Sequence, residues 1–145
     1  MSYLLDTNIL LRLSQKTHSM YPIVRTALRK LHTNKEQLCI IPQNIIEFWA
    51  VATRPLVSNG LELTIDEAAH ETKKLKRIFN LLPDSPNIFN EWENLVIQHQ
   101  VMGKPTHDAR LVAAMNVHKV THLLTFNTSD FKRFTNITAV DPSDV

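Results

Sequence analysis

Four acidic side chains stand out because each interrupts or closes an apolar stretch, where an ionised group is costly unless it is paired. Asp6 lies inside SYLLDTNILLRL, and Glu47 lies inside IIEFWAVA. Asp108 opens HDARLVAAM, and Asp130 ends LLTFNTSD, in which Asn127 stands three residues earlier. If these side chains gather in one place, their mutual repulsion raises their pKa values unless a cation neutralises them.

An oxygen-rich cluster of this kind, without cysteine or paired histidine, is typical of sites that bind Mg²⁺ or Mn²⁺. Such ions complete their shells with water and phosphate oxygens, which indicates hydrolysis of a phosphate ester by metal-activated water. Each acid also has an ordinary structural interpretation. Glu47 can pair with Arg54, Asp108 can stabilise the first turn of a helix, and Asp130 can close a turn.

Five short apolar runs predict buried parallel strands that position these acids. The runs are at residues 3–6, 38–41, 80–83, 122–125 and 137–140. Segments with helical length and pattern lie around and between them, at residues 20–31, 43–53, 65–79, 88–101 and 106–118. This alternation predicts an α/β domain with helices on both faces of the sheet. Parallel topology can bring all four acids to the carboxyl edge of the sheet, where ligands gather.

Length and composition bound the protein class. The 145 residues, 43% of them hydrophobic, predict one domain over residues 1–145. Sixteen Lys and Arg against fourteen Asp and Glu permit an anionic partner without demanding one. The single cysteine, Cys39, excludes an intramolecular disulfide and fits a reducing compartment. With no signal sequence and no apolar stretch of roughly 18 residues, we expect a cytoplasmic protein that makes no membrane contact.

Four segments resemble the motifs of PIN-domain ribonucleases of the VapC-like kind, the toxins of toxin-antitoxin pairs. They are LLDTNILL, IIEFWAVATRP, GKPTHDARLVAAM and LLTFNTSDF, and together they span nearly the whole chain. The resemblance implies a three-layer α/β/α fold with a four- or five-stranded parallel sheet. It implies an endoribonuclease whose Mg²⁺ or Mn²⁺ is held by Asp6, Glu47 and Asp108, with Thr7 or Asn8 orienting the site or the substrate. It also implies an RNA substrate, a cognate antitoxin protein and a homodimer.

One position departs from the family pattern. The family often has a fourth acid after the strand at 122–125, where this chain has Asn127. Asn127 offers an amide oxygen without a charge, and Asp130 is the next acid, so we expect Asn127 to lie near the site and Asp130 to support catalysis. Asn127 also favours an alternative, a catalytically weak PIN-like module that binds RNA or protein. A phosphotransferase that forms an aspartyl phosphate on Asp6 is a second alternative, in which Glu47 has no role.

Basic residues beside these motifs are candidates for contacts with RNA phosphates. Arg54, Lys104 and Arg110 have comparable claims from sequence, and each is equally well explained as an ordinary surface charge. The run KKLKR at residues 73–77 is more typical of a solvated helix face than of a nucleic-acid groove.

Overall fold

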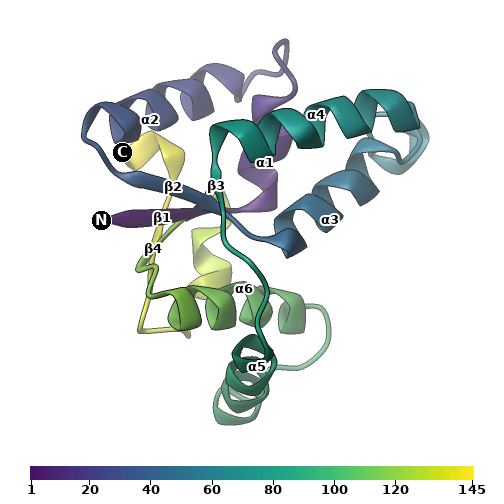
Figure 1. Ribbon diagram of the computed structural model, residues 1–145. Coiled ribbons are helices and arrows are strands. Elements are labelled where there is room, and N and C mark those ends of the chain that lie inside the picture. Colours follow the sequence, from purple (N-terminus) through teal and green to yellow (C-terminus); the bar gives the residue numbers. More distant parts are fainter.

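The computed structural model describes all 145 residues around a parallel sheet of five strands in the order β3-β2-β1-β4-β5 (Figure 1). The strands are β1 (Ser2–Leu5), β2 (Gln37–Ile40), β3 (Asn80–Leu81), β4 (His122–Leu124) and β5 (Thr138–Val140). The central strand β1 pairs with β2 and β4, so that Leu4 lies between Cys39 and Leu123. Both faces of the sheet are covered, which is why its central strands are apolar almost throughout.

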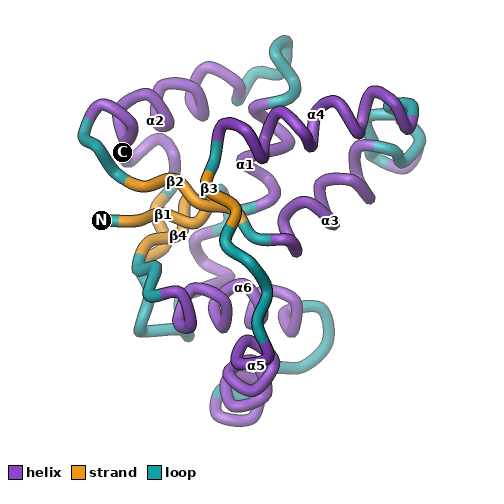
Figure 2. The backbone as a smooth tube through the Cα atoms, in the orientation of Figure 1, coloured by secondary structure: helices purple, strands orange, loops and turns teal.

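Six helices form the outer layers, α1 to α4 on one face and α5 with α6 on the other (Figure 2). The helices are α1 (Thr7–Leu13), α2 (Tyr21–Thr33), α3 (Pro42–Ala52), α4 (Ile65–Ile78), α5 (Pro86–Gln98) and α6 (Pro105–His118). Because side chains alternate along a strand, Tyr3 and Leu5 enter the core beneath α1 to α4, whereas Leu4 enters the core beneath α5 and α6. The predicted three-layer α/β/α fold is therefore confirmed.

The five predicted strands and five predicted helices all form, with ends that differ by a few residues. Three helices begin at a proline, Pro42, Pro86 or Pro105, rather than after it, because proline fits the first helical position. The helix α1 was not predicted, and neither were three short 3₁₀ turns. These turns are η1 (Leu56–Ser58), η2 (Thr128–Phe131) and η3 (Pro142–Asp144). Cys39 is a buried free thiol in the core.

The position of Asp6 explains how the apolar run that contains it divides into two elements. Asp6 keeps an extended backbone, with φ −67° and ψ 156°, and its side chain accepts a hydrogen bond from the first backbone N–H of α1. It therefore ends β1 and caps α1 at once. None of the six helices has the length and apolar character that crossing a membrane requires.

Candidate active site

Asp6 is the fixed centre of the carboxyl edge of the sheet. Its side chain is 9% exposed and accepts three hydrogen bonds. Oδ1 accepts from the backbone N–H of Thr7 at 2.7 Å. Oδ2 accepts from the hydroxyl of Thr125 at 2.7 Å and from the amide of Asn8 at 3.5 Å. Burial raises the pKa of Asp6 although the bonds from Thr125 and Thr7 lower it, so these bonds offset only part of the desolvation.

Thr125 and Asn8 join the start of α1 to the segment that follows β4. The hydroxyl of Thr125, a fully buried residue, accepts from the backbone N–H of Asn127 at 3.0 Å. The amide oxygen of Asn8 accepts from the backbone N–H of Phe126 at 3.4 Å. Asn127 thus contacts the site through its main chain, whereas its exposed side chain makes no hydrogen bond.

Asn44 joins the start of α3 to the same centre. It is fully buried, and its amide donates to the hydroxyl of Thr7 at 3.4 Å. Its carbonyl oxygen accepts from the backbone N–H of Ile41 at 2.9 Å, which is a capping bond for α3. Thr7 therefore lies between Asp6 and Asn44, and these polar contacts hold the first turns of α1 and α3 together. Sequence reasoning missed Asn44 and Thr125, and no capping signature marked Asn44, because Ile41 is not a residue type that caps helices.

The other acids approach Asp6 from the helices and from η2. Glu47, on α3, is partly buried, and its Oε1 is buried without any hydrogen-bond partner. Burial, assisted by the charge of Asp6, raises the pKa of Glu47. In the first turn of α6, burial and the charges of Asp6, Asp130 and Glu47 raise the pKa of Asp108 to about 6. Asp130, on η2, is exposed, and its charge contributes to the raised pKa values of Asp6 and Asp108.

These couplings mean that the four predicted acids lie around one edge of the sheet. The alternative interpretation of Glu47, an ion pair with Arg54, does not occur, because Arg54 is exposed and makes no ion pair. A cavity of about 850 Å³ lies between the end of α1, the loop after η1 and α4, but none of the four acids lines it.

A divalent cation fits the chemistry of this cluster. The donors are carboxylate oxygens, their pKa values are raised by burial and by one another, and the buried Oε1 of Glu47 lacks a partner. No three acidic, histidine or cysteine side chains stand close enough together to form a complete metal site as placed.

Comparison with known proteins agrees with the fold. Among solved structures, VapBC2 from Rickettsia felis bound to a DNA fragment from its promoter matches with a TM-score of 0.74 and 16% identity, over 97% of this chain and 98% of that one. A toxin-antitoxin complex from Klebsiella pneumoniae matches with a TM-score of 0.65 and 21% identity, over 99% of both chains. VapC20 from Mycobacterium tuberculosis, a Sarcin-Ricin loop cleaving toxin, matches with a TM-score of 0.65 and 12% identity, over 88% of this chain and 92% of that one.

A search of curated protein sequences finds no significant match. The sequence model of the PIN domain, however, matches residues 3–137, and these residues include every acid of the cluster. The chain therefore belongs to the PIN-domain family.

Proposed function

We propose that this protein is an Mg²⁺- or Mn²⁺-dependent endoribonuclease that hydrolyses RNA phosphodiester bonds as the toxin of a toxin-antitoxin pair. The observation that carries the proposal is the electrostatic coupling of Asp6, Glu47, Asp108 and Asp130 at the carboxyl edge of a PIN-domain sheet. A cluster of carboxylates with raised pKa values, none of which makes an ion pair, is costly unless it holds a cation.

In this proposal Asp6, Glu47 and Asp108 hold the ion. When bound, the ion supplies an activated water and neutralises charge on the attacking and leaving oxygens. Thr125 and Thr7 keep Asp6 in one orientation through bonds to both of its oxygens. Asp130, which is exposed on η2, supports catalysis in this proposal.

The partners belong to the same proposal. The similar structures include a toxin-antitoxin complex and a toxin that cleaves the Sarcin-Ricin loop, which supports an antitoxin partner and an RNA substrate for this chain. We propose an antitoxin protein that covers the acidic edge, a homodimer, and action in the cytoplasm.

A second candidate, a catalytically weak PIN-like binding module, is favoured by one observation. The side chain at the family's fourth acidic position, Asn127, is uncharged, exposed and free of hydrogen bonds. The aspartyl-phosphate alternative is disfavoured, because residue 8 is Asn8 rather than a second acid and Glu47 has no role in that chemistry.

The experiment is incubation of the purified chain with end-labelled single-stranded and structured RNAs in Mn²⁺, Mg²⁺ or EDTA. Asp6→Asn and Asp108→Asn are tested beside Asp66→Asn, a matched control at an exposed acid of α4. Cleavage that requires metal and is lost in the first two variants only would support the nuclease. Wild-type rates in either active-site variant would contradict the assignment. RNA binding without cleavage, by a chain that also binds no Mn²⁺, would favour the module.

A further inference from the structure

One cation stands beside the acidic cluster. Arg110 lies on α6, two residues after Asp108, and its guanidinium bonds to Gln43, which stands one turn before Glu47 on α3. Arg54 and Lys104 had equal claims from sequence, but both are exposed and neither makes an ion pair. The structure therefore separates three residues that the sequence left equivalent.

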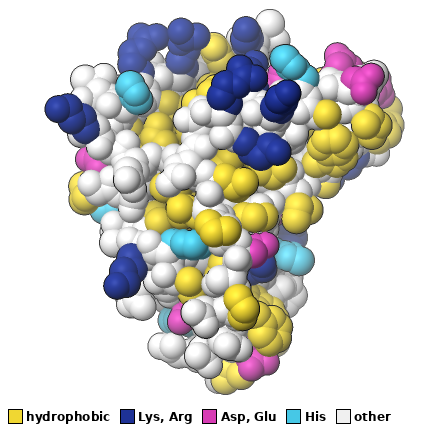
Figure 3. All heavy atoms as spheres, in the orientation of Figure 1, with side chains coloured by type: hydrophobic (Ala, Val, Ile, Leu, Met, Phe, Trp, Pro, Cys, Tyr) yellow, Lys and Arg dark blue, Asp and Glu magenta, His cyan; other side chains and the backbone are white.

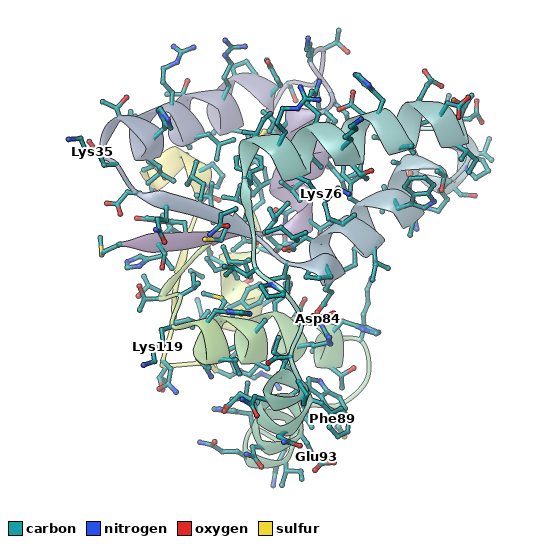
Figure 4. The ribbon with its side chains drawn as sticks, in the orientation of Figure 1. Lys35, Lys76, Asp84, Phe89, Glu93 and Lys119 are labelled. Atoms are coloured by element: carbon teal, nitrogen blue, oxygen red, sulfur yellow. The ribbon has the colours of Figure 1, made fainter.

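The guanidinium of Arg110 is held by two side chains from other elements. Its Nη1 donates to Oε1 of Gln43 at 3.2 Å, and its Nη2 lies 3.3 Å from Oδ1 of Asp84. Gln43 also donates from Nε2 to the backbone carbonyl of His107 at 2.9 Å. Gln43 is one turn before Glu47 on α3, and Asp84 lies on the segment between β3 and α5, close to α6 (Figure 4).

This arrangement keeps Arg110 away from the oxygens that a metal ion would need. Arg110 makes no ion pair with Glu47 or Asp108, and its only ion pair is with Asp84. The structure uses two of the five N–H donors of the guanidinium, which leaves three for a ligand. The side chain of Asp84 is 48% exposed, and an exposed ion pair of this kind exchanges easily.

We propose that Arg110 is a phosphate-binding residue of this site, held beside the carboxylates by Gln43 and Asp84 so that it binds a non-bridging phosphate oxygen of the RNA backbone. Arginine suits this task because its planar donor group matches the geometry of phosphate oxygens. The inference rests on the proposed function in one respect, that the substrate is RNA.

The test measures RNA binding rather than cleavage. Full-length protein is titrated into a fluorescein-labelled single-stranded RNA of mixed sequence, in EDTA and in about 50 to 200 mM KCl, and anisotropy is recorded. The variants are Arg110→Gln and Asp84→Asn. The control is Arg29→Gln, which alters an exposed arginine of α2 with no side-chain bond. Figure 3 shows that many Lys and Arg side chains of the visible face gather over α2 and α4, so the control also samples that basic surface.

The expected result is a loss of about tenfold in RNA affinity for Arg110→Gln at the lowest salt, because one charge-assisted contact is removed. The slope of log affinity against log salt should fall in magnitude by about 0.7, the value for one phosphate contact on a single strand. Asp84→Asn should bind RNA at least as tightly as the wild type, since the competing carboxylate is gone. Arg29→Gln should change the affinity by less than about twofold.

A purely structural role gives a different pattern. If Arg110 only fastens the segment before α5 to α6, Arg110→Gln and Asp84→Asn will lower the melting temperature together and leave RNA affinity and salt slope unchanged. That result overturns the inference and leaves the proposed nuclease intact. If Arg29→Gln alone weakens binding, the phosphate contact lies on α2, and the inference is again wrong. A wild-type chain that binds no RNA would overturn the proposed function and this inference together.

Discussion

The Asp108→Asn substitution should make the metal-free protein more stable. Burial and the charges of Asp6, Asp130 and Glu47 raise the pKa of Asp108 from 3.8 to about 6. The native state then binds this proton more tightly than the unfolded state, so the free energy of unfolding falls as pH rises from about 4 to about 6. A shift of this size corresponds to about 3 kcal/mol. Because Asp108 is only partly buried, solvent screening leaves about 1 to 2 kcal/mol.

A neutral asparagine avoids that cost. In EDTA near pH 7.5 we expect the variant to melt about 3 to 6 °C above the wild type, and the difference should vanish near pH 3, where Asp108 is largely protonated in both states. Saturating Mn²⁺ should reverse the order, because an ion at 100 times its Kd adds about 2.7 kcal/mol to the wild type and much less to the variant. Thermal unfolding followed by circular dichroism checks this, with Asp66→Asn as the control. A variant that melts below the wild type in EDTA at the higher pH would refute the reasoning.

Three further substitutions test two positions of the site and the loop after η1. Thr125→Val removes the hydroxyl that donates to Asp6, so denaturant unfolding should show a loss of about 2 kcal/mol. The same change should raise the pKa of Asp6, so that cleavage is lost at a higher pH as the solution is acidified; an unchanged pH–rate profile would contradict this. Gly60→Ala would place its Cβ 1.9 Å from the backbone oxygen of Arg54, so we expect a loss of about 2 to 3 kcal/mol in thermal unfolding, and an unchanged melting temperature would be inconsistent with that contact. Asn127→Asp adds a charge near the cluster and should tighten Mn²⁺ binding in calorimetry while lowering metal-free stability; equal affinity would show that residue 127 lies outside the metal site.

The layers of the fold were predictable because the buried strands are apolar runs with helical patterns around them. The helix α1 was not, because its seven residues include Ile9, Leu10 and Leu11, all buried, which continue the apolar run of β1. A helix this short is stabilised by packing rather than by propensity. The one local signal was Asp6 itself, which has the chemistry of a helix cap. β3 is also shorter than the predicted run, with two residues against four.

The acids of the site were predictable because an ionisable group in apolar surroundings is unusual, but their neutral partners were not. Threonine and asparagine are common at the ends of strands and helices, so type alone does not single out Thr125 or Asn44. Strand register supplies the missing information. Leu5 of β1 pairs with Leu124 of β4, and the next residue on each strand is then Asp6 and Thr125. Knowledge of which strands pair would have placed that hydroxyl beside the carboxylate.

Asp6 serves the fold and the proposed chemistry through the same side chain, and two substitutions separate these roles. Asparagine keeps an oxygen that can cap α1 while removing the charge, so Asp6→Asn should fold normally and lose metal-dependent stabilisation. Asp6→Ala removes the cap as well, which lowers the free energy of unfolding by about 1 kcal/mol. Removal of the buried charge offsets part of this loss. Chemical denaturation in EDTA and in Mn²⁺ should therefore rank the metal-free proteins with Asp6→Asn above Asp6→Ala, and neither variant should respond to the ion. If Asp6→Asn gained as much stability from Mn²⁺ as the wild type, the charge of Asp6 would have no role in holding the ion, and its place in the apolar run would be explained by the cap alone.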